Sequence, residues 1–119
     1  MEVERRFGLH KLLTLTTENK TRLLNLDAFV RFTEQIISKY DMEQVGISTH
    51  IFETGGYTAA ICLKESHICV HTWPEINSLT LDVYLCNYQR NNEQNVRDIG
   101  QEFVVFFEGK IINENEINR

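Results

Sequence analysis

The sequence predicts a single α+β domain, a two-layer sandwich in which a mainly antiparallel sheet carries two helices on one face. Three observations lead to this prediction. The chain has 119 residues, which is the length of one ordinary domain. Alternating side chains mark several strands, whereas apolar residues at steps of three and four mark only two helices. So few helices cover one face of a mainly antiparallel sheet and give two layers.

The first half of the chain predicts a strand, a helix and a second strand. Residues 9–16 form a short apolar run without helical periodicity, which indicates a strand. Polar residues 17–20 open the helix and Asp41 ends it. The apolar face of this helix comprises Leu23, Leu26, Val30, Thr33, Ile37 and Tyr40. Residues 45–52 alternate between two kinds of side chain, so they form a strand with two different faces.

The second half predicts three further strands, a helix and a short last strand. A turn signal, Thr54-Gly55-Gly56, precedes them. The strands are predicted at residues 57–63, 67–72, 79–86 and 109–112. Pro74 ends the second of these, because proline cannot continue a strand ladder. The helix is indicated by four apolar residues on one face: Val96, Ile99, Phe103 and Phe106.

One face of the predicted sheet carries side chains that are unusual for a face exposed to solvent. The apolar positions of the strands at 67–72 and 79–86 face the helices. The alternate positions face away, and they hold His67, Cys69, His71, Thr80, Asp82, Tyr84 and Cys86. Phe52, His50 and Ser48 share one side of their own strand. Histidine, cysteine, aspartate and aromatic residues on one face indicate a pocket or an interface.

Composition excludes several classes of protein. The formal net charge is −5, with 17 acidic and 12 basic residues, which argues against a general nucleic-acid binder. The three cysteines are odd in number and form no CxxC motif, so we expect no disulfide framework and a cytoplasmic location. The N-terminal residues lack the apolar core of a signal peptide, and no apolar stretch approaches ~20 residues, so we expect no membrane span.

Pattern alone leaves the chemistry of the histidines and cysteines open. His67, Cys69 and His71 share one strand face, and with Cys86 they form a candidate zinc site. Alternate positions on one strand are not the usual zinc spacing, so no metal is predicted and a structural role is favoured. Cys86 and His71 also form a candidate pair of nucleophile and base. A packed cysteine at a strand end is the simpler interpretation.

A longer motif surrounds Glu65-Ser66-His67, a segment that by itself indicates only a solvated turn. The segment runs Lys64-Glu65-Ser66-His67-Ile68-Cys69-Val70-His71-Thr72-Trp73-Pro74-Glu75. Further along the chain comes Leu81-Asp82-Val83-Tyr84-Leu85-Cys86, and earlier parts are Gly8-x-His10 and His50-x-Phe52. This pattern resembles the short-chain bacterial S-adenosylmethionine decarboxylases, which are self-processing and pyruvoyl-dependent, and the resemblance covers about residues 8–112.

The resemblance implies that the protein cuts its own backbone between Glu65 and Ser66, into a β chain of residues 1–65 and an α chain of residues 66–119. In the family, the serine hydroxyl attacks the preceding carbonyl to form an ester, elimination leaves dehydroalanine, and hydrolysis yields a pyruvoyl group. His71 matches the histidine that removes the proton in the elimination. Thr58 takes the place of a serine that assists processing, with the hydroxyl retained and a methyl group added.

The resemblance also implies the reaction: decarboxylation of S-adenosylmethionine to the aminopropyl donor of spermidine biosynthesis. A Schiff base joins the pyruvoyl group derived from Ser66 to the substrate, and the neighbouring amide carbonyl accepts the released electrons. Cys86 matches the general acid that returns a proton to the substrate. Phe52 matches the ring that stacks on adenine and Glu75 the carboxylate that binds the ribose. The expected assembly is a homodimer with sites built from both protomers, without nucleic-acid or membrane partners.

Two alternatives and three discrepancies accompany this hypothesis. The same pyruvoyl chemistry serves arginine or ornithine decarboxylases, in which an acidic group such as Asp82 would bind the basic substrate. An uncleaved, regulatory subunit is the other alternative. Relatives often have Pro-x-Gly where this chain has Thr54-Gly55-Gly56, and an acidic residue where it has Leu13-Thr14-Leu15. Strict strand alternation also places Ser66 and His71 on opposite faces, although the family needs both in one site.

Overall fold

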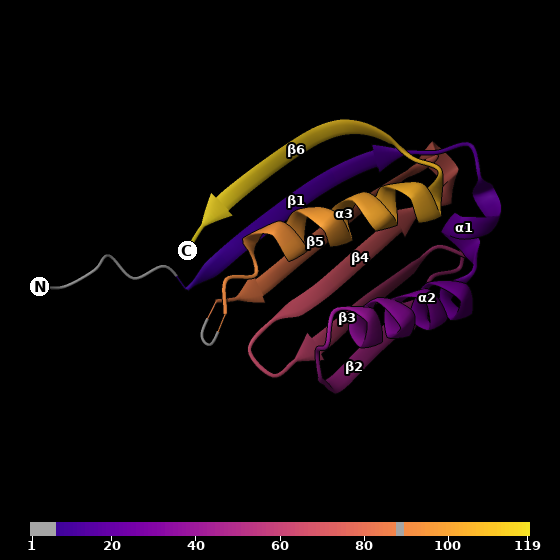
Figure 1. Cartoon of the computed structure of the whole chain (residues 1–119). Coiled ribbons are helices and arrows are strands. Elements are labelled where there is room, and N and C mark those ends of the chain that lie inside the picture. The colour runs from indigo at the N-terminus through magenta and orange to yellow at the C-terminus, as the bar shows by residue number, and fades with distance from the viewer. Residues whose placement is uncertain (1–6, 88–89) are drawn as a thin grey trace, which may run out of the picture.

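A computed structural model describes residues 7–87 and 90–119 of the chain. It contains one six-stranded sheet with its helices on one side (Figure 1). In chain order the elements are β1 (Gly8–Thr16), α1 (Lys20–Leu24), α2 (Leu26–Lys39), β2 (Gln44–Ile51), β3 (Tyr57–Leu63), β4 (His67–Trp73), the 3-10 helix η1 (Pro74–Ile76), β5 (Ser78–Cys86), α3 (Glu93–Phe107) and β6 (Lys110–Asn118). No helix in the described ranges is long and apolar enough to cross a membrane.

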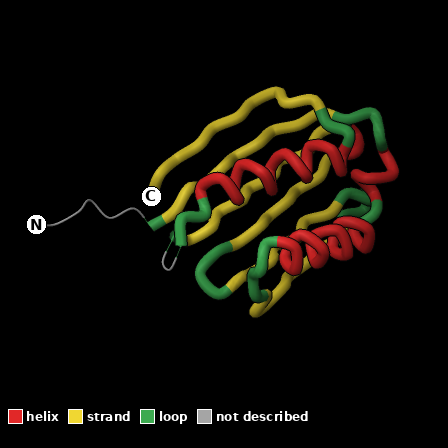
Figure 2. Tube along the Cα trace, in the orientation of Figure 1, coloured by secondary structure: helices red, strands yellow, loops and turns green. Residues whose placement is uncertain are grey.

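The sheet has the strand order β2-β3-β4-β5-β1-β6, and every neighbouring pair is antiparallel. Strands β2 to β5 follow one another along the chain and across the sheet, while β1 lies between β5 and β6. Figure 2 shows the two long helices, drawn in red, on the same side of the strands. The predicted two-layer α+β sandwich is therefore confirmed, and the other side of the sheet, which we call the open face, carries no helix.

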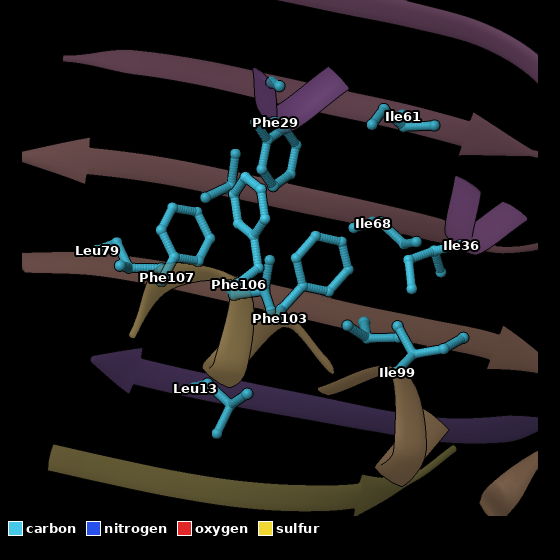
Figure 3. Packing of buried hydrophobic residues seen from close by; sticks show 14 of the residues in the cluster. Leu13, Phe29, Ile36, Ile61, Ile68, Leu79, Ile99, Phe103, Phe106 and Phe107 are labelled. Atoms are coloured by element: carbon cyan, nitrogen blue, oxygen red, sulfur yellow. The ribbon is translucent and has the colours of Figure 1, made fainter. Parts of the chain in front are cut away.

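The core lies between the helices and the sheet. Phe29 of α2 packs against Phe103 and Phe107 of α3, with ring centroids 5.5 and 6.1 Å apart (Figure 3). Ile61 and Ile68 face them from β3 and β4, and both are almost fully buried. A fully buried side chain of this size contributes roughly 1.5–3 kcal/mol to the stability of the fold. The apolar face predicted for the second helix is thus the face that α3 buries.

The single helix predicted after the first strand is two helices in the structure, so that prediction is wrong. The break comes at Asn25, whose side chain accepts a hydrogen bond from the backbone N–H of Ala28 at 3.0 Å and so caps the start of α2. Asparagine is among the best N-cap residues, which explains the new start. The predicted face is also rotated. The residues that α2 buries are Phe29, Thr33, Ile36 and Ile37, whereas Leu26, Val30 and Tyr40 are only half-buried.

The last strand is longer than the predicted 109–112, because β6 is nine residues long and eight of them pair with β1. All nine side chains of β6 are classed as exposed, so the strand has little of the apolar alternation from which a strand is predicted. Lys11 of β1 anchors it. The Lys11 side chain is only 7% exposed, and its ammonium group donates to the carboxylates of Glu114 and Glu116. Burial opposes the positive charge of Lys11, but these two partners outweigh burial and raise its pKa.

Candidate active site

The site residues predicted from the sequence lie in two groups at opposite ends of β4. One group consists of Glu65, Ser66 and Cys86, at the turn between β3 and β4 and the end of β5; we call it the Ser66 group. The other consists of Phe52, Thr58, His71 and Glu75, near the turn between β2 and β3 and the helix η1; we call it the His71 group. Figure 1 shows these two ends of the sheet.

Ser66 is held from two sides in its turn. Its carbonyl oxygen accepts a hydrogen bond from the backbone N–H of Leu63 at 2.9 Å, which closes the turn. Its hydroxyl oxygen accepts one from the backbone N–H of Cys86 at 2.9 Å. The Cys86 thiol lies 3.4 Å from a carboxylate oxygen of Glu65 and donates to it. The serine, the residue before it and the cysteine therefore form one connected cluster.

A cavity of about 670 Å³ adjoins this cluster, between the end of α2, the β3–β4 turn and the segment after β5. Its charged lining residues are Asp41, Glu43, Lys64, Glu65 and Arg90. The Arg90 guanidinium donates to the carbonyl oxygens of Tyr40 and Asp41 at 2.8 and 3.2 Å, which satisfies the end of α2. The side chain of Asn92 donates to the carbonyl oxygen of Cys86 at 2.8 Å and fixes the end of β5. The reactive cluster thus opens onto a polar cavity.

Thr58 and His71 form the centre of the His71 group. They lie opposite each other on β3 and β4, and the Thr58 hydroxyl is 2.8 Å from Nδ1 of His71. The Trp73 ring lies on the same face, with its centroid 6.0 Å from that of His71. The His71 side chain is exposed on the open face. A hydroxyl at Nδ1 orients the ring and leaves Nε2 directed elsewhere, which is the arrangement of an oriented base. The added methyl group of threonine does not prevent this contact.

Phe52 and Glu75 lie at the same end of the sheet as His71. Phe52 follows β2 with 45% of its surface exposed, and its ring meets that of His50 edge-on at 4.7 Å. Glu75 is exposed in η1. The two segments touch, because a Cβ at Gly56 would lie only 2.7 Å from Cδ of Pro74. Phe52 and Glu75 thus lie on neighbouring segments at the end of the sheet that holds His71.

The two groups are too far apart to form one site within one chain. His71 is five residues from Ser66 along the extended strand β4, which is about 16 Å at roughly 3.3 Å per residue. On β5, His71 faces Thr80, six residues before Cys86, which is about 20 Å away by the same rise. The pair of Cys86 as nucleophile and His71 as base, considered from the sequence pattern, is therefore not formed within a chain. The separation of Ser66 and His71 is set by the length of the extended strand β4, and strict alternation does not govern Ser66, which lies in the turn before this strand.

The comparisons with known proteins agree on one family. The family model described as S-adenosylmethionine decarboxylase matches residues 9–119. The chain belongs to the S-adenosylmethionine decarboxylase family. It is 40% identical over 83 residues to the S-adenosylmethionine decarboxylase proenzyme of Prochlorococcus marinus (strain MIT 9211), a match that covers 69% of this chain and 67% of the relative. It is 33% identical over 86 residues to the proenzyme of the same name from Methanococcus aeolicus, covering 72% of this chain and 74% of that protein.

A solved structure supports the fold. The crystal structure of the adenosylmethionine decarboxylase from Aquifex aeolicus VF5 superimposes with a TM-score of 0.78, covering 98% of this chain and 91% of the other at 19% sequence identity. This identity is low, so the likeness concerns the fold. The S-adenosylmethionine decarboxylase fold and the family predicted from the sequence are thereby confirmed.

The candidate zinc site does not assemble in this member of the S-adenosylmethionine decarboxylase family. Within residues 7–87 and 90–119, no three histidine, cysteine, aspartate or glutamate side chains are arranged to hold a metal ion. Cys69 lies opposite Asp82 on β5. Burial, and then the charge of Asp82, raises the pKa of the Cys69 thiol, so this cysteine is a weak ligand and a weak nucleophile.

A row of three rings beside the Ser66 group was not recognised from the sequence. His10, Tyr84 and His67 lie opposite one another on β1, β5 and β4, with ring centroids 5.5–5.8 Å apart. Burial, and then the neighbouring His10, lowers the pKa of His67, so this residue next to Ser66 is held neutral. Nε2 of His10 is buried without a hydrogen bond, 3.6 Å from Asp82. Only strand register aligns three such distant residues, so the sequence carried no local signal for the row.

Proposed function

We propose that this chain is the precursor of an S-adenosylmethionine decarboxylase and that it cuts its own backbone between Glu65 and Ser66. The products are a β chain of residues 1–65 and an α chain of residues 66–119. The observation that carries the proposal is the contact between the Ser66 hydroxyl and the backbone N–H of Cys86 at 2.9 Å, in a chain of this family. The named relatives are proenzymes, which fits a chain that matures by cleavage.

The geometry suits attack by Ser66 on the carbonyl carbon of Glu65. The Ser66 hydroxyl is tied to that carbonyl through its own backbone, so the two atoms stay within a few bonds of each other. The N–H of Cys86 donates to the Ser66 hydroxyl oxygen, which favours the ionised, nucleophilic form of this hydroxyl. Turn residues, unlike the paired residues of β3 and β4, have few ladder bonds to break when the backbone is cut.

Ser66 also fits the role of precursor to the pyruvoyl group. Its position beside Cys86 and the cavity leaves room for a small substrate at the new chain end. The pyruvoyl group supplies a ketone that binds the substrate amine and an amide carbonyl that accepts the electron pair released with carbon dioxide. Cys86, the nearest thiol to Ser66, acts as the general acid that delivers a proton to the substrate.

The active protein is a homodimer of processed protomers in which each site takes the Ser66 group from one protomer and the His71 group from its partner. Support comes from the separation of the two groups on one open face. A two-fold axis that lies between two such faces and runs across the strands reverses the direction of one sheet, so opposite ends of the two copies meet. His71 of the partner subunit then serves in proton removal during cleavage, with the partner's Thr58 orienting it. The partner's Phe52 and the partner's Glu75 serve adenine and ribose.

The location we propose is the cytoplasm. Cys62 and Cys69 form no disulfide, and Cys62 is exposed. Free thiols of this kind persist where the surroundings are reducing.

A substrate panel tests the reaction. Fully cut protein is incubated with carboxyl-labelled S-adenosylmethionine, arginine and ornithine, and released carbon dioxide is counted. We expect release from S-adenosylmethionine and background from the other two, since no observation favours either amino acid. Release of carbon dioxide from arginine or ornithine alone would show that this amino acid, and not S-adenosylmethionine, is the substrate. Background release from all three would contradict the proposed decarboxylase activity.

A further inference from the structure

The Glu65 carboxylate contacts the Cys86 thiol. Glu65 directly precedes the proposed cut, so cleavage turns it from a residue within the turn into a chain end. The sulfur is 3.4 Å from Oε1 of Glu65, the last residue before the cleavage point. Two hydrogen bonds fix the backbone of Cys86. Its N–H donates to the Ser66 hydroxyl oxygen, and its carbonyl oxygen accepts from the side chain of Asn92. The thiol therefore stays in place, and the intact turn holds the carboxylate against it.

A carboxylate in this position opposes ionisation of the thiol, because a thiolate would lie beside a second negative charge. Among the described residues, further titratable or charged groups around Cys86 are Asp41, Glu43, Lys64, Arg90, His67, Tyr84 and His10. Lys64 pairs with Glu43 at 3.4 Å, and Arg90 is bound to two carbonyl oxygens. The lowered pKa of His67 keeps that ring from supplying a positive charge. Glu65, by contrast, accepts a hydrogen bond from the thiol of Cys86 itself.

We propose that Glu65 is a positioning residue that holds Cys86 in its thiol form while the chain is intact and releases it when the backbone is cut. The inference rests on the proposed function, in which Cys86 is the general acid and the cut falls between Glu65 and Ser66. In the intact chain, a thiolate at Cys86 would be a strong nucleophile next to the carbonyl that Ser66 must attack, and Glu65 suppresses it. After the cut, Glu65 ends a free chain terminus and the turn no longer fixes it.

The consequence for catalysis concerns the pKa of the Cys86 thiol, the proposed general acid. A general acid works best when its pKa lies near the working pH. Loss of the Glu65 carboxylate from the sulfur brings the Cys86 thiol closer to that condition. Maturation then activates the proton donor in the same event that creates the new chain end.

The test uses the uncut Ser66→Ala chain, so that no activity is needed as a readout. Cys86 is alkylated with iodoacetamide at a series of pH values, and the rate is followed by mass spectrometry of the peptide that contains it. The pH midpoint of this rate reports ionisation, whereas a change in accessibility alters only the plateau. We expect Glu65→Gln to lower the midpoint by about one pH unit. The matched control, Glu43→Gln, removes a carboxylate from the same cavity and should leave the midpoint unchanged.

The same profile on cut wild-type protein tests the release, because its midpoint should lie below that of the uncut chain. An uncut Glu65→Gln chain with the parent's midpoint would overturn the proposal, and so would an equal shift in Glu43→Gln. A midpoint that cutting leaves unchanged would overturn the release. Wild-type protein that never cuts would contradict the proposed function, while the uncut chains would still decide whether Glu65 controls the thiol.

Discussion

Single contacts decide the chemistry of the two groups. At the Ser66 end, one backbone N–H from Cys86 holds the serine oxygen at 2.9 Å. At the His71 end, one threonine hydroxyl holds Nδ1 of the imidazole at 2.8 Å. Thr58 and His71 lie within paired strands, and Ser66 lies in a short turn that is tied to the end of β5 through Cys86. The orientation of the reactive atoms therefore comes from the sheet and not from a flexible loop.

The Thr58 contact predicts a graded effect on cleavage. Thr58→Ala removes the hydroxyl that orients His71, at a cost of about 1 kcal/mol, so cleavage should slow roughly fivefold. Thr58→Ser keeps the hydroxyl and should cut at close to the wild-type rate. The rates are followed on denaturing gels as the full-length band is lost. Equal rates for the alanine and serine variants would contradict the assigned role.

His67 predicts how stability depends on pH. Its pKa in the folded protein is lowered from the ordinary value of 6.5, by burial first and by His10 next. The unfolded chain therefore binds more protons than the folded one below pH 6.5, and the stability contributed by neutral His67 falls as the pH is lowered through the folded pKa. Urea unfolding of the Ser66→Ala chain between pH 5 and pH 8 should show this decline. His67→Gln should flatten it, whereas His50→Gln, at an exposed position, should not.

At the scale of elements, β6 depends on Lys11. The lysine side chain enters the helix side of the sheet beside Gly100, where a Cβ would come within 3.0 Å of Cδ of Lys11. From there it reaches Glu114 and Glu116, and Arg97 of α3 adds a second ion pair to Glu116 at 3.1 Å. These side chains link the exposed edge strand to β1 and α3. The hydrogen bond from Lys11, as the largest cause, holds the pKa of Glu116 below its ordinary value.

Lys11→Met should loosen β6 while the rest of the sheet persists. Methionine keeps the apolar stem of the side chain but removes the charge that Glu114 and Glu116 share. Amide hydrogen exchange should accelerate in Lys110–Asn118 and stay unchanged in β3 and β4. Uniform acceleration across all six strands would show that Lys11 supports the whole fold instead of this one strand.

The strands with clear alternation were predictable, and the elements without it were not. The prediction of 57–63 matches β3 residue for residue, because this segment is rich in β-forming and small residues and follows a turn signal. The length of β6 was missed since polar residues such as Asn113 and Asn115 give no apolar period. The break at Asn25 was missed because a cap inside an apolar periodic pattern is a local hydrogen bond, which periodicity does not report.

The candidate site shows the same division. Resemblance gave the identities of Ser66, His71 and Cys86, and the predicted strand at 67–72 separates the first two, but no property of the sequence placed Cys86 beside Ser66. The distance between Ser66 and His71 follows from an extended β4, and the position of Cys86 beside Ser66 follows from the pairing of β4 with β5. Register is a property of the folded sheet, so the split into two groups appears only in three dimensions.

At the scale of the whole molecule, the separation of the two groups is the reason for proposing that assembly is part of the mechanism. The open face carries both groups and has no helix over it, and the chain has no second domain in the described ranges to cover it. A second copy placed by a two-fold axis would cover the open face and would also bring a Ser66 group and a His71 group together. The proposed dimer would contain two complete sites, each built from both protomers.

Mixed dimers test this shared site. The Ser66→Ala and His71→Ala chains are produced separately and by co-expression, with a mass tag on one of them. Alone, neither should be cut. In the mixture, a heterodimer has one complete site, formed by Ser66 of the His71→Ala chain and His71 of its partner, so roughly half of the His71→Ala chains should be cut. An uncut mixture of folded chains would contradict a site shared between protomers.

The most direct test of the central claim is an intact-mass spectrum of the purified wild-type protein under denaturing conditions. The account predicts two species, one that ends at Glu65 and one that begins with a pyruvoyl group in place of Ser66, and a Ser66→Ala control that stays whole. A single wild-type species of 119 residues that persists after long incubation would contradict it.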